Sequence, residues 1–297
     1  DFQSDSLQHR SHGLERLGLE EYGLEMPAAW ACEERLEELF GFPRNLVLSQ
    51  GRLAEALLAR LLVRKDCIIP TNLAFPTTRL HQELQGGRSE ECACPEACCF
   101  DAELPFKGDL DLDRLEDLLR GKTAAKIPYL CVELCVNGAG GQPVSLGNLR
   151  AARRITREHG IALVLDATRI LENAAQIRER DEACRRLSLW EIVREICAQA
   201  DALTMSLSKD FPTPIGGLLA LRDEGLYQQG LDFLMAMGDG LARREKAGIH
   251  AALRYAQDDP RYIEHRVGLV QRLHAGLARK SFPLVRPAGG HAVFLRV

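Results

Sequence analysis

The fold of this 297-residue chain is indicated most clearly by the stretch IALVLDATR, residues 161–169. Its first five residues form an apolar run of strand length, the kind that is buried on both faces of a parallel sheet. The carboxylate of Asp166 follows directly, and the cation of Arg169 comes three residues later. A buried carboxylate is costly unless a positive group meets it, so this strand end is a candidate for binding a protonated heterocycle. A structural salt bridge between Asp166 and Arg169, or a helix N-cap, is the alternative.

Similar apolar runs alternate with helical patterns along the rest of the chain. This alternation is typical of the α/β class, in which helices are layered on a mostly parallel sheet that binds ligands at the carboxyl ends of its strands. We expect strands at Asn45–Ser49, Cys67–Pro70, Ile127–Val132, Ile161–Leu165, Ala202–Ser206 and Leu218–Leu221. We expect helices at Ala28–Phe40, Leu53–Arg64, Thr77–Gln85, Leu112–Leu119, Ser145–His159, Leu189–Gln199 and Arg261–Arg279, and a non-helical loop at the glycine-rich residues 138–143.

Composition argues against several classes of partner. The 38 Lys and Arg residues against 42 Asp and Glu residues give a formal net charge of −4, so we expect no nucleic-acid partner. The apolar runs are far shorter than the roughly 20 residues that cross a bilayer, so we expect a cytoplasmic protein without membrane contact. Ten cysteines include four in the segment Cys92–Cys99. Their C-x-C-x3-C-C spacing does not match a common zinc pattern, so we expect free thiols there.

A second strand end carries a lysine, because the run Ala202–Met205 is followed by Ser206-Leu-Ser-Lys209. A lysine amine that lies near other cations and partly out of water can form an imine with an aldehyde and later move protons. Taken alone, the motif is equally that of an exposed lysine without a role. Together with Asp166, it matches the arrangement of pyridoxal-phosphate enzymes of the aspartate-aminotransferase-like class, fold type I, which is a three-layer sandwich.

Two further segments fit a pyridoxal-phosphate site. Gln50-Gly51-Arg52 begins a helix directly after a strand. Its backbone N–H groups, helix dipole and guanidinium can therefore bind a phosphate, to which Ser206 can also donate; a simple turn is the alternative. Phe75 follows another strand and can stack on a planar cofactor, with core packing as the alternative.

We divide the chain into three parts. Residues 1–40 are an N-terminal arm and helix, residues 41–235 a large domain that binds pyridoxal phosphate, and residues 236–297 long helices that lead into a small C-terminal α+β domain. The strand-like pieces Leu284–Arg286 and Ala292–Val297 begin this small domain, which we expect to be incomplete.

Several motifs together resemble those of the β-eliminating lyase family, which includes tryptophanase and tyrosine phenol-lyase. The resemblance runs from near the start of the chain to residue 297, with a shortened stretch around Leu231–Gly240. The matching segments are Leu134–Ser145, Asp166–Ala174, Tyr262–Val267, Thr77–Leu84 and Gly289–Phe294.

The resemblance implies a role for each matched residue. Lys209 would form the imine with the cofactor, and Asp166 would pair with its pyridine nitrogen. Phe75 would stack on its ring. The phenolic oxygen would be approached by Asn137 and Arg169, and the phosphate would be held by Gln50, Gly51, Arg52 and Ser206.

Two matched residues lie in the N-terminal arm. Tyr22 resembles the family's tyrosine that acts as an acid toward the leaving group and reaches across from a neighbouring subunit, which implies a homodimer or homotetramer. Glu20 resembles a ligand of a monovalent cation, but Pro214 replaces the asparagine that supplies another ligand. We therefore expect no metal.

The chain also departs from the family's pattern. Pro76 stands where tyrosine phenol-lyase has a threonine that touches the phenol, one of the paired lysines has become Ser208, and the C-terminal segment with the substrate-carboxylate arginine is not in this sequence. These changes argue against an aromatic leaving group. Because a thiolate or persulfide leaves more readily than an aromatic carbanion, we expect cleavage of a carbon–sulfur bond in an S-substituted cysteine or thiocysteine, giving thiol or persulfide, pyruvate and ammonia.

Three functions therefore stay open. The carbon–sulfur lyase also resembles the cysteine or thiocysteine lyase domains of modular polyketide synthases, which implies a substrate tethered to a carrier protein. The alternative enzyme is a tyrosine phenol-lyase or tryptophanase that releases an aromatic group. A binding module that keeps the fold without chemistry is the third, against which the presence of Lys209, Asp166 and Arg169 argues.

Overall fold

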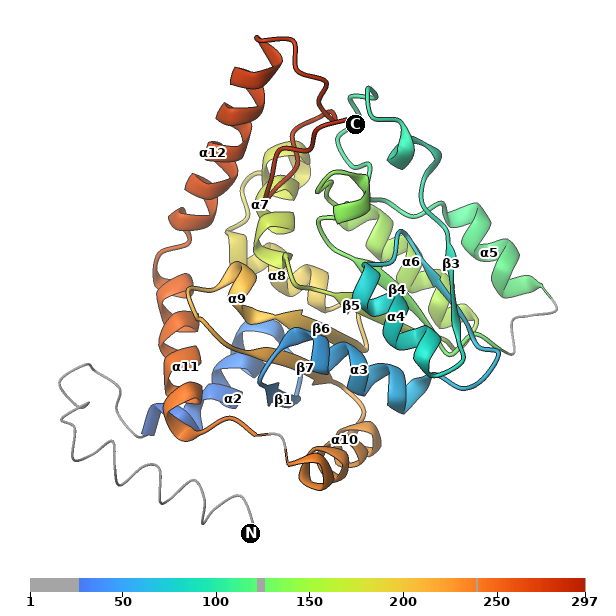
Figure 1. Cartoon of the computed structure of the whole chain (residues 1–297), viewed down its shortest axis with the longest axis vertical. Coiled ribbons are helices and arrows are strands. Elements are labelled where there is room, and N and C mark those ends of the chain that lie inside the picture. The colour runs from blue at the N-terminus through green and yellow to red at the C-terminus, as the bar shows by residue number, and fades with distance from the viewer. Residues whose placement is uncertain (1–26, 122–125, 239, 297) are drawn as a thin grey trace.

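A seven-stranded sheet lies between two layers of helices in this protein (Figure 1). The computed structural model describes residues 27–121, 126–238 and 240–296. The strand order is β1-β7-β6-β5-β4-β2-β3. The strands are β1 (Arg44–Leu48), β2 (Ile68–Thr71), β3 (Arg88–Glu91), β4 (Tyr129–Glu133), β5 (Ala162–Asp166), β6 (Ala202–Ser206) and β7 (Gly217–Leu221). Strands β3, β2, β4, β5 and β6 are parallel, and β7 runs antiparallel to its neighbours β6 and β1.

The central strand β5 has the apolar composition that burial on both faces requires. Leu163 and Leu165 pack into one hydrophobic cluster, while Val164 between them packs into another cluster on the opposite face. All three side chains have no exposed surface. Because successive residues of a strand point to opposite faces, an unbroken apolar run is what a sheet covered on both sides needs.

Helices cover the two faces unequally. Helices α3 (Gly51–Leu62), α4 (Pro76–Leu84) and α10 (Glu224–Met237) lie on the side of Val164. The other face is covered by α2 (Pro27–Phe40), α5 (Leu112–Arg120), α6 (Leu146–Glu158), α7 (Ile170–Arg180), α8 (Leu189–Cys197), α11 (Arg243–Asp258) and α12 (Arg261–Ala278). The short pieces are α9 (Leu207–Asp210) and the 3-10 turns η2 (Pro95–Cys98), η4 (Asn137–Ala139) and η5 (Glu182–Cys184).

The structure confirms the expected α/β class, and each of the predicted strands and helices is present with small shifts at its ends. Elements that the sequence patterns did not reveal are β3, α7, α9, α10 and α11. Strand β3, with the sequence RSEE, carries no apolar residue because it is the edge strand and is largely open to solvent.

Two local predictions need correction. The glycine-rich loop is not wholly non-helical, because the 3-10 turn η4 enters it before Gly140 and Gly141 adopt positive φ angles of 87° and 72°. The C-terminal pieces Leu284–Arg286 and Ala292–Val297 do not form strands in the described residues, which show there a single antiparallel bridge between Leu284 and Leu295. The proposed three-part division of the chain stays a prediction. Among the described helices, none is long and apolar enough to cross a membrane.

Candidate active site

A cavity of about 490 Å³ lies at the carboxyl ends of β4, β5 and β6. The parallel strands end at the same edge of the sheet, so the loops that follow them converge there. Nine of the residues singled out from the sequence line this cavity, namely Gln50, Gly51, Arg52, Phe75, Asn137, Asp166, Arg169, Ser206 and Lys209. The structure therefore brings these residues together, while the role of each one stays a prediction. The remaining two, Tyr22 and Glu20, lie outside the described residues.

Asp166 is the last residue of β5, and its side chain is only 4% exposed. Its Oδ1 accepts a hydrogen bond of 3.3 Å from the backbone N–H of Thr168. Burial raises the pKa of Asp166 above its ordinary value. The alternative of a salt bridge to Arg169 is wrong, because Arg169 pairs with Glu172 instead. Since no ion pair links Asp166 to a cation within the described part of the chain, this carboxylate lacks the positive partner that its burial calls for.

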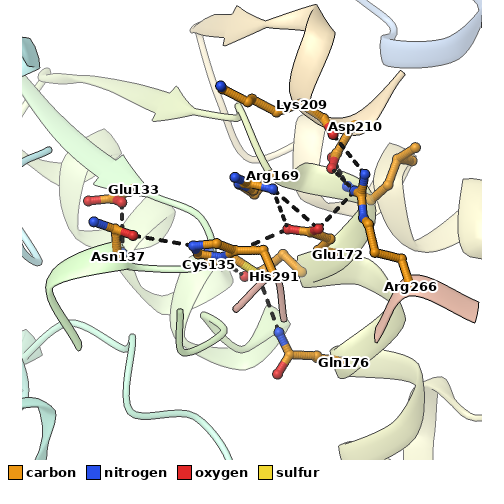
Figure 2. A network of polar contacts seen from close by, with 12 residues as sticks. Glu133, Cys135, Asn137, Arg169, Glu172, Gln176, Lys209, Asp210, Arg266 and His291 are labelled. Carbon is orange, nitrogen blue, oxygen red and sulfur yellow. Dashed lines mark hydrogen bonds and ion pairs between the residues drawn. The ribbon is translucent and has the colours of Figure 1, made fainter. Parts of the chain in front are cut away.

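Lys209 reaches the same cavity from α9, a single turn that follows β6 without a loop. Within the described residues its amine has no hydrogen-bond or ion-pair partner, and its side chain is exposed to the cavity. Figure 2 shows the amine extending freely from α9 on the side of Arg169. An amine in this position is free to react.

The first turn of α3 forms an anion-binding corner. Gln50 is the N-cap but makes no side-chain capping bond, so the first backbone N–H groups of a 12-residue helix are available for a ligand. A Cβ placed on Gly51 would lie 2.7 Å from the Cβ of Ser206 and 2.8 Å from its backbone. The helix therefore approaches the end of β6 as closely as only glycine permits. Arg52 adds a guanidinium, which also donates to the Gln50 side chain at 3.2 Å.

Two carboxyl groups that the sequence reasoning missed also line the cavity, Glu55 and Glu133. Burial, and next the charge of Asp166, raise the pKa of Glu55 to about 7. Burial, followed by the charge of Asp166, raises the pKa of Glu133 well above its ordinary value. Glu133 ends β4 in register with Asp166 on β5, and its Oε1 accepts from the backbone N–H of Asn137 at 2.8 Å. The sequence signal for Glu133 was a charged residue within the apolar run of residues 127–136. Glu55 gave no such signal, because it lies in an ordinary helical pattern.

The third missed residue is His291, which the C-terminal segment brings to the cavity. Its Nε2 lies 3.2 Å from Oδ1 of Asn137, and its Nδ1 lies 3.9 Å from Oε2 of Glu172 (Figure 2). Burial, and then the charges of Arg169 and Arg266, lower the pKa of His291 to about 4, so the ring is neutral near pH 7. The motif Gly289–Phe294 was the sequence signal, but nothing local showed that it packs against the loop after β4.

The cysteine segment Cys92–Cys99 lies apart from this cavity. Cys92 is buried and Cys94 is half-buried, while Cys98 and Cys99 are exposed, and all are free thiols. Among the residues that the structure describes, no three His, Cys, Asp or Glu side chains are grouped so as to hold a metal ion.

These residues fit pyridoxal phosphate. Buried Asp166 matches a pyridinium nitrogen and the Lys209 amine matches an aldehyde, since neither has an ion-pair partner within the described part of the chain. The glycine corner at the start of α3 matches a phosphate. Fold and site together therefore define the class as an α/β protein of pyridoxal-phosphate fold type I.

The chain belongs to the beta-eliminating lyase family, whose sequence profile matches residues 13–294. Members of this family use pyridoxal 5'-phosphate as their cofactor, in agreement with the donor set described above.

Curated relatives and solved structures agree with this assignment. Tyrosine phenol-lyase from Symbiobacterium sp. (strain SC-1) is 39% identical over 98% of this chain and 64% of the relative. Tyrosine phenol-lyase from Intrasporangium calvum is 41% identical over 88% of this chain and 56% of the relative, so the chain spans about 60% of the length of these relatives.

Two solved structures share the fold at low sequence identity. Threonine aldolase from Leishmania major has a TM-score of 0.66 at 18% identity, over 91% of this chain and 74% of that one. A putative aromatic amino acid beta-eliminating lyase/threonine aldolase from Exiguobacterium sp. 255-15 has a TM-score of 0.64 at 16% identity, over 88% and 67%. At these identities the likeness concerns the fold alone.

Proposed function

We propose that this protein is a pyridoxal-phosphate-dependent lyase that eliminates the β-substituent of an amino acid. The observation that carries the proposal is the presence, in one cavity, of a buried carboxyl group, Asp166, and an amine, Lys209, neither of which has an ion-pair partner among the described residues. Family membership supports the same conclusion.

The residues of the cavity divide the work of binding. Asp166 would hold the proton on the pyridine nitrogen, and the backbone of α3 with Gly51 and Arg52 would hold the phosphate. Phe75 would pack on the ring. Further contacts would come from Asn137 and Arg169 to the phenolic oxygen, and from Gln50 and Ser206 to the phosphate.

The chemistry needs an electron sink and a mobile proton. When bound, pyridoxal phosphate supplies a sink for the charge that develops at the α-carbon of the substrate. The Lys209 amine would remove the α-proton of the substrate as a general base. Asp166 would favour this step by keeping the ring nitrogen positive. Tyr22, which lies outside the described residues, is our proposed acid toward the leaving group, supplied by a second copy of the chain in a homodimer or homotetramer.

For the leaving group, we propose an aromatic one, as in tyrosine, in place of the carbon–sulfur bond expected from the sequence. Two of the relatives are named tyrosine phenol-lyase. Moreover, Pro76, one of the changes on which the carbon–sulfur expectation depended, is exposed and is not among the residues that line the cavity, whereas its neighbour Thr77 is. These relatives also give no support to a carrier-tethered substrate in a polyketide synthase. A carbon–sulfur bond stays the second candidate because Ser208 replaces one of the paired lysines.

One set of assays tests the whole proposal. Purified protein with added pyridoxal phosphate is mixed with tyrosine, tryptophan or S-substituted cysteines, and pyruvate is followed. We expect pyruvate and phenol from tyrosine in the wild type, and none with Lys209→Ala; Lys280→Ala, which removes an exposed lysine far from the cavity, is the matched control. Pyruvate from S-substituted cysteines but not from tyrosine would restore the carbon–sulfur reaction. A protein that takes up no cofactor would refute the proposal altogether.

A further inference from the structure

Helix α9, which carries Lys209, is too short to hold its own position. It consists of the four residues Leu207–Asp210, and a single turn of helix is unstable by itself. The last carbonyl groups of a helix have no partner within it, so they must be satisfied from outside. The Asp210 carbonyl accepts from the Tyr262 hydroxyl at 2.5 Å, and the Lys209 carbonyl accepts from Nη1 of Arg266 at 2.8 Å. Both donors belong to α12.

The side chain of Arg266 is itself fixed by two carboxylates that have no exposed surface. Its Nη2 lies 2.9 Å from Oδ1 of Asp210 and 2.8 Å from Oε1 of Glu172. The other oxygen of Asp210 accepts from the backbone N–H of Leu171, at the start of α7, at 2.7 Å. The guanidinium of Arg266 therefore contacts α9 at the Lys209 carbonyl and at the Asp210 carboxylate. Its contact with Glu172 of α7 fixes its orientation.

Glu172 extends this arrangement to a second cation of the cavity. Nη1 of Arg169 lies 3.3 Å from both oxygens of Glu172, opposite Arg266 (Figure 2). Arg169, Glu172, Asp210 and Arg266 thus form an ion cluster in which the two carboxyl groups are fully buried and the two arginine side chains are partly exposed. Burial raises the pKa of both carboxyl groups, that of Asp210 to about 8, and the charge of Arg266 lowers both pKa values. Removal of Arg266 therefore takes away the ion-pair partner of Asp210 and leaves Glu172 with Arg169 alone.

We propose that Arg266 is a positioning residue, which holds the Lys209 amine at the cavity through the backbone of α9. It also shares Glu172 with Arg169, which lines the cavity, and so fixes the position of both cations. The inference rests on the proposed function only for its effect on turnover. Arg266 does not line the cavity, so it acts through other residues and not on the ligand. No motif near Lys209 shows this dependence, because the two residues are 57 positions apart.

Replacement of Arg266 should change kcat more than KM and should be partly rescued by lysine, which loss of a merely structural residue would not do. In Arg266→Gln, the shorter and uncharged glutamine cannot replace the guanidinium at its three acceptors. Lys209 then samples more positions, and we expect kcat to fall roughly 10- to 100-fold with a smaller change in KM, since misplacement of a reacting group by about 1 Å has an effect of this size. Arg266→Lys restores the charge but not the forked geometry, so it recovers part of the loss.

The first measurement needs no cofactor. Amide hydrogen exchange is compared in the whole cofactor-free chain for wild type, Arg266→Gln, Arg266→Lys and Arg272→Gln, an exposed arginine on the same helix that serves as the control. We expect amides of the segment that spans α9 to exchange about tenfold faster in Arg266→Gln, with Arg266→Lys between it and the wild type. Arg272→Gln should match the wild type. If Arg266→Gln fails to fold, the intermediate exchange of Arg266→Lys decides the question.

The second measurement is the rate at which added pyridoxal phosphate is captured, followed by its visible absorption band. Slower capture in Arg266→Gln, partly rescued in Arg266→Lys, supports the positioning role. Unchanged exchange in α9 together with unchanged capture would overturn it, as would an equal acceleration of exchange throughout the chain without rescue by lysine. A wild type that captures the cofactor but releases no pyruvate contradicts the proposed function alone, because exchange and capture still report on Arg266.

Discussion

Replacement of Glu55 by glutamine should make the cofactor-free protein more stable at alkaline pH. The folded protein raises the pKa of this carboxyl from an ordinary value of 4.5 to about 7, first through burial and next through the charge of Asp166. A group whose pKa is raised on folding contributes stability below its unfolded pKa and loses that contribution as the pH rises through the folded value. Above pH 7 the ionised Glu55 side chain therefore lowers the free energy of unfolding. A glutamine side chain has a similar shape but carries no charge, so it avoids this loss.

The size of the effect follows from the pKa difference. A rise from 4.5 to about 7 corresponds to at most about 3 kcal/mol, of which roughly 2 kcal/mol is lost between pH 5 and pH 8. We expect the free energy of unfolding of Glu55→Gln, relative to wild type, to increase by about that amount over this interval. The comparison cancels the similar contribution of Asp109, whose pKa burial raises to about 6.

Urea unfolding of the cofactor-free protein at pH 5 and pH 8 measures this difference directly. Glu158→Gln, which alters an exposed glutamate at the end of α6, serves as the control and should show the same change of stability between pH 5 and pH 8 as the wild type. The same stability difference between Glu55→Gln and wild type at both pH values would refute the reasoning, because it would mean that Glu55 is not held in its neutral form by the fold.

Three further outcomes are expected. Gly51→Val should lower the affinity for pyridoxal phosphate about 10-fold or more in equilibrium dialysis, because the new Cβ would lie 2.7 Å from the Cβ of Ser206. Gly147→Ala is the control, since nothing lies within 4 Å of its new Cβ. An equal loss of affinity in both variants would argue against phosphate binding at the start of α3. Asp166→Asn should weaken the affinity for pyridoxal phosphate roughly 100-fold, since the pyridinium nitrogen would lose its buried anionic partner. An unchanged affinity in a fluorescence titration would exclude this contact. Leu163→Ala should cost about 2–5 kcal/mol of unfolding free energy in urea, because Leu163 is fully buried, and a cost below about 1 kcal/mol would contradict the close packing of this core.

The sequence was most informative where local pattern and burial coincide. β5 could be placed from residues 161–169 because both faces of that strand are covered, so all of its positions are apolar until Asp166. Burial on all sides had the opposite effect for helix α7. Its residues from Ile170 to Ile177 are all buried, so they show no amphipathic period by which a helix could be recognised. The edge strand β3 was missed because an exposed strand needs no apolar residues.

The candidate site was predictable only in part. Residues that follow strands, such as Asp166 and Lys209, carry a local signal because parallel strands end at one edge of the sheet. Glu55 and His291 carry none, because their presence in the cavity depends on how α3 and the C-terminal segment pack. The Asp166–Arg169 salt bridge, inferred from spacing, was wrong because Glu172, in the first turn of α7, offers Arg169 a carboxylate that Arg266 also contacts.

By itself, the sequence determined the α/β class, every strand of the sheet except β3, and the strand ends that precede the carboxylate and the amine. It could do so because burial imposes apolar residues at short, regular spacings along the chain. Only the tertiary structure decided which charges are paired, since Arg266 meets the Lys209 carbonyl across 57 positions of sequence. An ion pair depends on distance in space, and no periodic pattern in the chain encodes the contact between α12 and α9.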